Sequence, residues 1–314
     1  MPKNRRPETA ATKAVVPIFR HPQLEPVVPP KKDALDSADA IAQNETPGGV
    51  IPPSGTVSAG LGEVELGSPQ TPTPDSVPVS EYIRGTFVPL SNLAQGWQLH
   101  AAVSLTPAEE RTMVREPAQA VPVSIGQRLG ALRVLIVPYI ACFDTGDVIA
   151  FTKPKGETHS AVWLEDPERI HLLLPCRELD AHDTGFEFLA SIGELLRPRL
   201  RPEEVGRYTA LLEEELRAGV RGEIDEEALG AKRSLLGSRL RRHRNPELFE
   251  RYRDVSLVST VAEYMHGLWH DVQIRVGPDH LPLPQLRRRM DLLAELFPPN
   301  PGFHVFAEEL VKEE

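Results

Sequence analysis

One apolar stretch sets the fold class of this chain: Leu132-Arg-Val-Leu-Ile-Val-Pro-Tyr-Ile-Ala-Cys-Phe143. Its branched side chains are typical of a buried strand, and the run is shorter than the roughly 18 residues that a membrane helix needs. Pro138 inside the run indicates an edge position or a bulge, because proline cannot donate a hydrogen bond to a neighbouring strand. The turn Asp144-Thr-Gly-Asp147 follows, and residues 148–151 return as the second strand of a hairpin.

Further short strands lie on both sides of this hairpin. Residues 97–105 alternate apolar and polar side chains with period two, and residues 160–164 and 170–174 are apolar runs between turns. Beyond Pro175 the apolar spacing becomes helical. The expected helices cover residues 183–196, 202–218, 225–242, 246–272 and 284–296. Strands followed by helices predict an α+β fold, in which the strands form a small antiparallel sheet or an open barrel.

Residues 1–80 differ in composition from the rest of the chain. They are rich in proline and hold one aromatic residue, Phe19, so they have too little apolar surface to offset the entropy of ordering. We therefore expect a disordered, proline-rich arm, followed by an antiparallel β-rich part at residues 81–178 and a helical part at residues 179–314. These two parts are expected to pack as one globular unit. Within the arm, Ala14-Val-Val-Pro-Ile-Phe19 either orders on a partner or belongs to a passive tail.

The formal net charge of −10 gives no support to nucleic-acid binding or to attachment to an anionic membrane. The basic stretches at residues 232–253 and 287–289 have acidic counterparts such as residues 213–215. They are expected to pair within the chain or to form an ordinary charged surface. No apolar stretch is long enough to span a membrane, and no secretory signal follows the basic N-terminus, so a cytoplasmic location is expected. Cys142 and Cys176 are expected to be reduced and partly buried rather than joined in a disulfide.

The strongest candidate for a chemical site is Glu263-Tyr-Met-His266-Gly-Leu-Trp-His270. If this stretch is helical, His266 and His270 lie one turn apart and can bind one metal ion, as the histidine pair in the helix of many zinc peptidases does. Glu263 lies one turn before His266 on the same polar face. Gly267 stands where those peptidases have the glutamate that serves as general base. The pattern therefore predicts a divalent metal such as zinc without naming a reaction.

A second group of polar residues, His182 and Glu187, lies at the junction between the strands and the first long helix, where loops commonly carry functional sites. These two residues would complete a metal shell if the fold brings them to the histidine pair. Two simpler interpretations stay open. The polar face of the 246–272 helix would be solvated, and Asp183 or Thr184 would serve only to cap the helix at residues 183–196, with Glu187 one turn inside it.

The sequence contains no glycine-rich phosphate loop, nucleophile elbow or dinucleotide fingerprint. The first functional hypothesis is therefore a non-catalytic cytoplasmic protein-interaction or assembly protein, which binds another protein through its disordered arm or its helical part. The alternative is a metal-dependent enzyme of the hydrolase class that uses the helical His266-x-x-x-His270 site. The distance of His182 or Glu187 from this pair discriminates between the two hypotheses.

Overall fold

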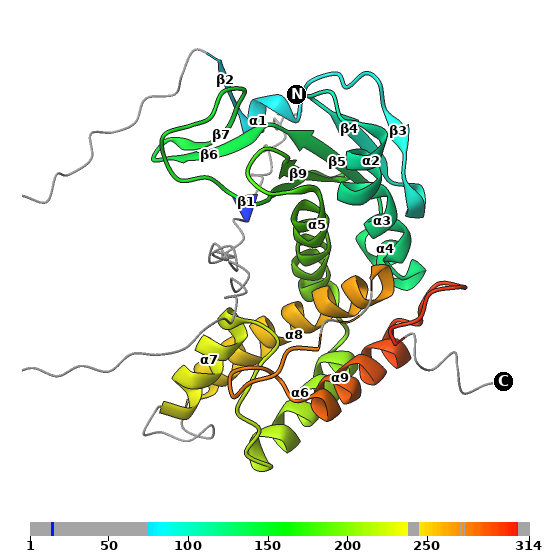
Figure 1. The fold of residues 1–314 in the computed structure, drawn as a ribbon. Helices are drawn as coiled ribbons and strands as arrows, with labels where there is room; N and C mark the ends of the chain where they lie inside the picture. The colour runs from blue at the N-terminus through cyan, green and yellow to red at the C-terminus, as the bar shows by residue number, and fades with distance from the viewer. Residues whose placement is uncertain (1–13, 16–74, 238–244, 271, 273, 307–314) are drawn as a thin grey trace, which may run out of the picture. The chain divides into compact units, whose positions relative to one another are not determined.

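The structure is a computed structural model that describes residues 14–15, 75–237, 245–270, 272 and 274–306 (Figure 1). The strands are β1 Ala14–Val15, β2 Ser76–Pro78, β3 Ser91–Asn92, β4 Gln98–Ala101, β5 Leu132–Val137, β6 Tyr139–Phe143, β7 Gly146–Ala150, β8 Val162–Glu165 and β9 Ile170–Pro175. The helices are α1 Val79–Tyr82, α2 Pro107–Glu110, α3 Glu116–Ala120, α4 Val123–Leu129, α5 Ala181–Leu196, α6 Pro202–Arg217, α7 Glu226–Gly237, α8 Pro246–Trp269 and α9 Leu283–Leu296. Other helical turns are η1 Ala94–Gly96, the π-helical η2 Arg111–Arg115 and η3 Arg197–Arg199. Most of the predicted arm, residues 1–80, lies outside the described residues.

The described strands form two sheets, ordered β1-β8-β9-β5-β4-β3 and β2-β7-β6. The predicted α+β fold, with strands first and helices afterwards, is confirmed. Pairing is antiparallel throughout the smaller sheet and at both sides of the larger one. The central strands β4, β5 and β9 instead run parallel. Parallel neighbours need long connections, and the chain supplies them: α2 to α4 lie between β4 and β5, while β6, β7 and β8 lie between β5 and β9.

Strand β5 is apolar along most of its length because both of its faces are buried. Val134 and Ile136 face the core that the sheet shares with the helices. Leu135 and Val137 face a smaller core, which includes side chains of α1 and of the β6-β7 hairpin. The sequence predicted an edge position or a bulge at Pro138 within one long strand, and this prediction is wrong. Pro138 ends β5, and the chain continues as β6 in the other sheet.

The first long helix begins with a different cap from the predicted one. The Asp180 carboxylate accepts a hydrogen bond from the Asp183 amide at 2.8 Å, so Asp180 caps α5. The prediction that Asp183 or Thr184 serves as this cap is wrong, because both residues already lie inside the first helical turn. His182 consequently lies in the first turn of the helix and not in the loop before it.

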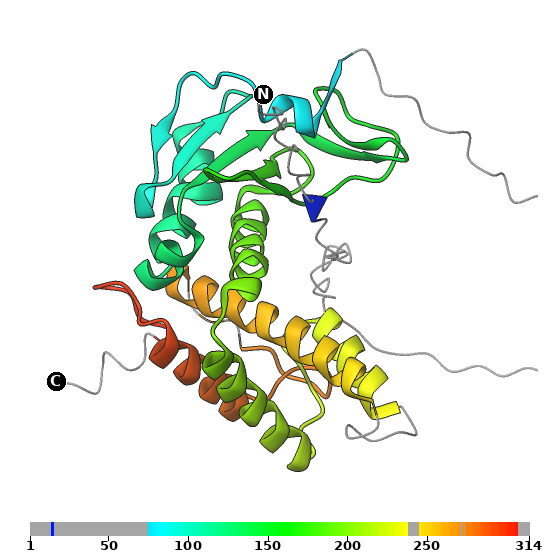
Figure 2. The same ribbon diagram turned by 180° about the vertical axis from the view of Figure 1, so that it is seen from behind.

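Helix α8 packs against α3, α5, α6, α7 and α9 (Figure 2). The sequence left open that the polar face of this helix is solvated, but Ser256, Ser259 and His266, which lie on that face, are all buried. Short hydroxyl-bearing side chains make this possible. The hydroxyl groups of Ser259 and Thr260 donate hydrogen bonds to backbone carbonyl oxygens one turn earlier in the helix, at 3.0 and 2.6 Å. Neighbouring helices can therefore cover these side chains without leaving a hydroxyl donor unsatisfied.

A buried ionic network connects α6, α7, α8 and α9. Arg289 of α9 donates to Glu215 of α6 at 2.6 Å and to Glu223 at 2.7 Å. Lys232 of α7 donates to Glu223 at 2.9 Å, and Tyr252 of α8 donates to the same carboxylate. All four charged side chains are at most 1 % exposed, and two positive charges match two negative ones. Burial alone would raise the pKa of Glu223, but its cationic and phenolic partners bring that pKa down to about 2.

Replacing Arg289 by methionine should strongly destabilise the helical half. Glu215 and Glu223 would stay buried without their main counter-charge, which typically costs about 3–5 kcal/mol of unfolding free energy. Urea denaturation followed by far-ultraviolet circular dichroism measures the change. Arg288→Met is the matched control, because Arg288 and its partner Glu214 are 48 and 52 % exposed, and exposed pairs contribute little. Equal effects at the two arginines would contradict a stabilising role for the network.

Candidate metal site between two helices

Helices α5 and α8 pack against each other (Figure 1) and carry four of the five predicted ligands. His182 lies in the first turn of α5, and Glu187 lies farther along the same helix. Glu263 and His266 lie in the last two turns of α8, and His270 directly follows that helix. The fold therefore brings His182, which is remote in the sequence, to the predicted histidine pair.

The sequence predicted a helix that continues to residue 272 and includes His270, but the observed helix is shorter. Helix α8 ends at Trp269, and His270 has the extended backbone angles φ −132° and ψ 176°. Its amide still donates to the His266 carbonyl at 2.7 Å, which keeps it beside the helix end. The pair thus lacks the one-turn helical geometry of the zinc peptidases. Asp271 lies outside the described residues.

The imidazoles of His182 and His266 meet through their Nε2 atoms, which are 3.3 Å apart. Two nitrogen ligands of a tetrahedral zinc ion, with bonds of about 2.0–2.1 Å, are separated by about 3.3–3.4 Å. Without an ion, the same contact is a hydrogen bond in which one ring donates and the other accepts. The His266 side chain is 5 % exposed and the His182 side chain 41 % exposed, so the contact joins the interior to the surface.

The second nitrogen of each ring lies near a carboxylate. His182 Nδ1 is 3.6 Å from Asp183 Oδ1, and His266 Nδ1 is 3.9 Å from Glu263 Oε2. Both separations exceed hydrogen-bond length, and His266 Nδ1 is buried without a hydrogen-bond partner among the described residues. Carboxylates behind metal-binding histidines orient the ring and raise its basicity. Glu263 lies on the Nδ1 side of His266, and its role as a ligand stays a prediction.

His270 brings a third imidazole to the cluster. Its ring centroid lies 5.1 Å from that of His182 and 5.8 Å from that of His266. Within the described part of the chain, no third His, Cys, Asp or Glu ligand atom lies within 4.8 Å of both Nε2 atoms. A third protein ligand, such as His270, would therefore have to move toward the pair before three ligands could meet at one ion. Glu187 is buried on α5, and its role as a ligand stays a prediction.

Two aromatic side chains that the sequence patterns did not single out enclose the cluster. Trp269 stacks on His182 with ring centroids 5.1 Å apart and an interplanar angle of 20°. Phe186 meets the His266 ring edge-on at a centroid distance of 5.4 Å. The sequence could have indicated both aromatic residues as neighbours of the histidines, because Phe186 lies one helical turn after His182 and Trp269 directly precedes His270.

Trp269 can reach α5 because residue 185 is glycine. A Cβ at Gly185 would lie 2.5 Å from the Trp269 ring and 2.7 Å from the Thr112 carbonyl oxygen. Thr112 belongs to the π-helical turn η2, which lies between α2 and α3. Pro117 in α3 accounts for this turn, since proline cannot donate to the carbonyl four residues earlier and its ring disturbs the regular helix there.

A hollow of about 530 Å³ opens beside this turn, and its lining includes Glu110, Arg111, Arg115 and Glu116. Glu116 accepts a long hydrogen bond of 3.5 Å from Trp269 Nε1. The hollow is therefore connected to the histidine cluster through the indole, and it offers both positive and negative charge to a ligand.

No protein-family model, curated protein or solved structure matches this chain. Its function has to be inferred from its own geometry. None of the described helices combines the length and the apolar character that a membrane span requires.

A methyl group added at Gly185 should force α5 and Trp269 apart, because the new Cβ would overlap the indole. We expect Gly185→Ala to lower the free energy of unfolding by about 1–3 kcal/mol in urea denaturation. Gly206→Ala in α6 is the matched control, since its added Cβ would meet no atom within 4 Å. Removing that helical glycine should instead stabilise the protein by about 0.5–1 kcal/mol. Similar losses at both glycines would contradict the close packing at Gly185.

Proposed function

We propose that this chain binds a divalent transition-metal ion, with zinc as the best fit and with His182 and His266 as its first two ligands. The observation that carries the proposal is the 3.3 Å separation of their Nε2 atoms. This separation equals the distance between two ligands of one tetrahedral ion. It also joins two helices whose histidines are 84 positions apart in the chain.

The surroundings of the pair favour an ion over a simple hydrogen bond between rings. A doubly charged cation is stabilised by nearby negative charge, and the Asp183 and Glu263 carboxylates lie 3.6 and 3.9 Å from the outer ring nitrogens. A metal on Nε2 fixes the remaining ring proton on Nδ1. The buried Nδ1 of His266, which has no described hydrogen-bond partner, would then carry its proton on the side of the Glu263 carboxylate.

His270 is the third ligand in this proposal. It is exposed and follows the helix in an extended conformation, so its side chain can turn toward the pair without disturbing α8. Three protein ligands would leave a fourth position for water, which is the pattern of catalytic zinc sites, and zinc lowers the pKa of such a water to about 7. A metal-dependent hydrolase is the enzyme class that this arrangement supports. The charged hollow beside Trp269 would then receive the substrate.

The metal content of the untagged full chain tests the proposal. We expect one zinc ion at this site in the purified or reconstituted protein, and the loss of one equivalent in His182→Ala and in His266→Ala, with affinity weakened by about tenfold or more. His270→Ala should weaken binding less, because its ring has to move to reach the ion. Affinity should also fall as the pH is lowered, since imidazole binds metal only when its nitrogen is deprotonated.

His100→Ala is the matched control for these replacements. His100 lies on β4, where its Nδ1 is 3.0 Å from the Pro89 carbonyl oxygen, and its loss should leave the zinc content unchanged. Failure to bind metal after reconstitution would overturn the proposal. So would a zinc content that is the same in the wild type, His182→Ala and His266→Ala.

We propose as a second candidate function the recruitment of a partner protein in the cytoplasm, which has the support of one observation. Strand β1 pairs antiparallel with β8 at the side of the larger sheet, with Ala14 opposite Leu164 and Val15 opposite Trp163. Addition of an extended segment to a sheet edge is a common way for domains to bind peptides. We propose that the β8 edge is a docking edge, and that Ala14 and Val15 occupy it within the same chain.

Val15→Pro should open this edge, because proline disrupts the ladder of hydrogen bonds. Hydrogen exchange of the β8 amides should become faster, whereas Val15→Ala, which keeps the backbone amide, should leave it unchanged. Equally slow exchange in the wild type and in both variants would remove the support for docking at this edge.

A further inference from the structure

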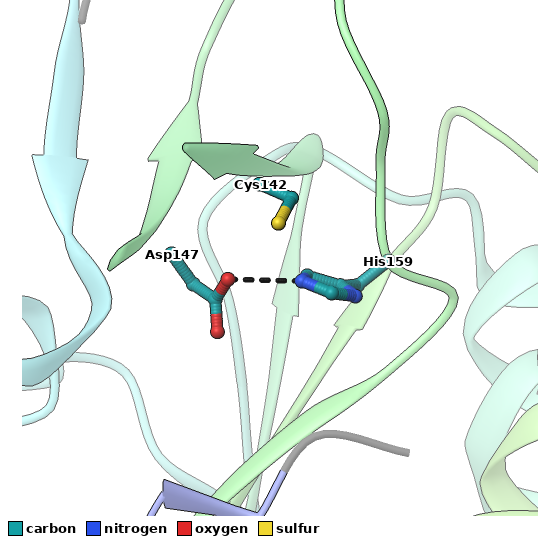
Figure 3. Close-up of side chains that lie close together, drawn as sticks. All are labelled: Cys142, Asp147 and His159. Atoms are coloured by element: carbon teal, nitrogen blue, oxygen red, sulfur yellow. Dashed lines mark hydrogen bonds and ion pairs between the residues drawn. The ribbon is translucent and has the colours of Figure 1, made fainter. Parts of the chain in front are cut away.

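A second cluster of metal-ligand side chains lies on the smaller sheet and the segment that follows it. Figure 3 shows Cys142, Asp147 and His159 pointing toward one another. One ligand atom of each residue, a thiol sulfur, a carboxylate oxygen and an imidazole nitrogen, lies within 4.8 Å of the other two. Among the residues that the structure describes, this is the one group in which three such atoms meet.

Strand pairing holds these side chains together. Cys142 of β6 and Asp147 of β7 are directly opposite each other across the hairpin, where side chains on one face are neighbours. His159 comes from the segment on the other side of β6. Its amide donates to the Ile140 carbonyl at 2.9 Å, and the Cys142 amide donates to the Glu157 carbonyl at 3.0 Å. The positions of all three ligands are therefore set by backbone hydrogen bonds.

The cluster is accessible and partly sheltered. His159 Nε2 lies 2.9 Å from Asp147 Oδ1, and both side chains are 15 % exposed. Cys142 is a free cysteine on the surface, in contrast to the partial burial expected from the sequence. The carboxylates of Asp144 and Glu157 act on the same thiol, so negative charge surrounds the position where a cation would bind.

We infer that Cys142, Asp147 and His159 form a zinc-binding site separate from the histidine cluster. Thiolate, imidazole and carboxylate are the three kinds of side chain that bind zinc. The sulfur donor disfavours magnesium and calcium, which take oxygen ligands. A bound ion would increase the distance between the Asp147 oxygen and the His159 nitrogen from 2.9 Å to about 3.3 Å. It would also fasten the β6-β7 hairpin to the segment after it, with a fourth position open to water.

A cysteine nucleophile activated by His159 would use the same three residue types, but the charges argue against it. Nucleophilic thiols are activated by nearby positive charge. Here burial, together with the carboxylates of Asp147, Glu157 and Asp144, raises the pKa of the Cys142 thiol. A divalent cation suits this acidic environment, because it binds the thiolate and offsets the surrounding negative charge.

Cobalt(II) substitution in the full chain tests the inference. A cobalt–thiolate bond produces an intense near-ultraviolet charge-transfer band, whereas a site made of histidines produces none. We expect this band in the wild type, its disappearance when zinc displaces cobalt, and its loss in Cys142→Ser. Asp147→Asn and His159→Gln should each weaken cobalt binding by about tenfold or more.

Cys176→Ala is the matched control, because Cys176 is the second free cysteine and is buried just after β9. It should keep the band, and so should the double variant His182→Ala/His266→Ala, which separates this inference from the proposed histidine site. The absence of a sulfur-to-cobalt band in the wild type would overturn the inference. A band that survives Cys142→Ser would overturn it as well.

Discussion

The helical half depends on an ionic network from which water is excluded. Two carboxylates and two cations neutralise one another in the interior, and the loss of any one would leave a net charge buried there. The network joins α6, α7 and α9 to α8, and α8 is the helix against which α5 packs. We therefore expect the 3.3 Å contact between His266 and His182 to depend on the buried charges that hold α8 among its neighbours. Arg289 of α9 would then support the geometry of the histidine cluster indirectly, through α8.

The two candidate sites are held by different physical means. The histidine cluster lies where two helices approach closely, and its geometry depends on side-chain packing, on the missing Cβ of Gly185 and on the stacked ring of Trp269. One of its three imidazoles still has to turn before an ion can be fully bound. The Cys142 cluster is set by strand register, and its three ligand atoms are already close together. Under the two proposals, the first site would hold a catalytic ion, and the second would hold an ion that stabilises the fold.

The sequence predicts the parts of this structure that local rules govern. The apolar run after Leu132 predicted a buried strand, and the order of strands and helices predicted the α+β class. Periodicity does not specify which strands become neighbours, so the parallel pairing of β4, β5 and β9 was not foreseen. At the histidine cluster, residue types indicated His182 and His266, but their contact depends on where α8 ends and on how closely α5 approaches it. Counting outward from the predicted turn at residues 144–147 would have placed Cys142 opposite Ile149. The observed hairpin pairs Phe143 with Gly146 and so places Cys142 opposite Asp147, and His159 lies in a segment with no strand pattern.

The spacing of the buried charges along the chain also bears on protein synthesis. Arg289 lies 74 and 66 positions after its partners Glu215 and Glu223. The two carboxylates therefore leave the ribosome well before the arginine that neutralises them, and Lys232 is the cation of the network that emerges first. Helices α6 to α8 cannot enclose both acids in a dry core until α9 has emerged. The strands from β4 to β9 have no such dependence on α9, so the sheet is expected to assemble during translation and the helical half to close after it.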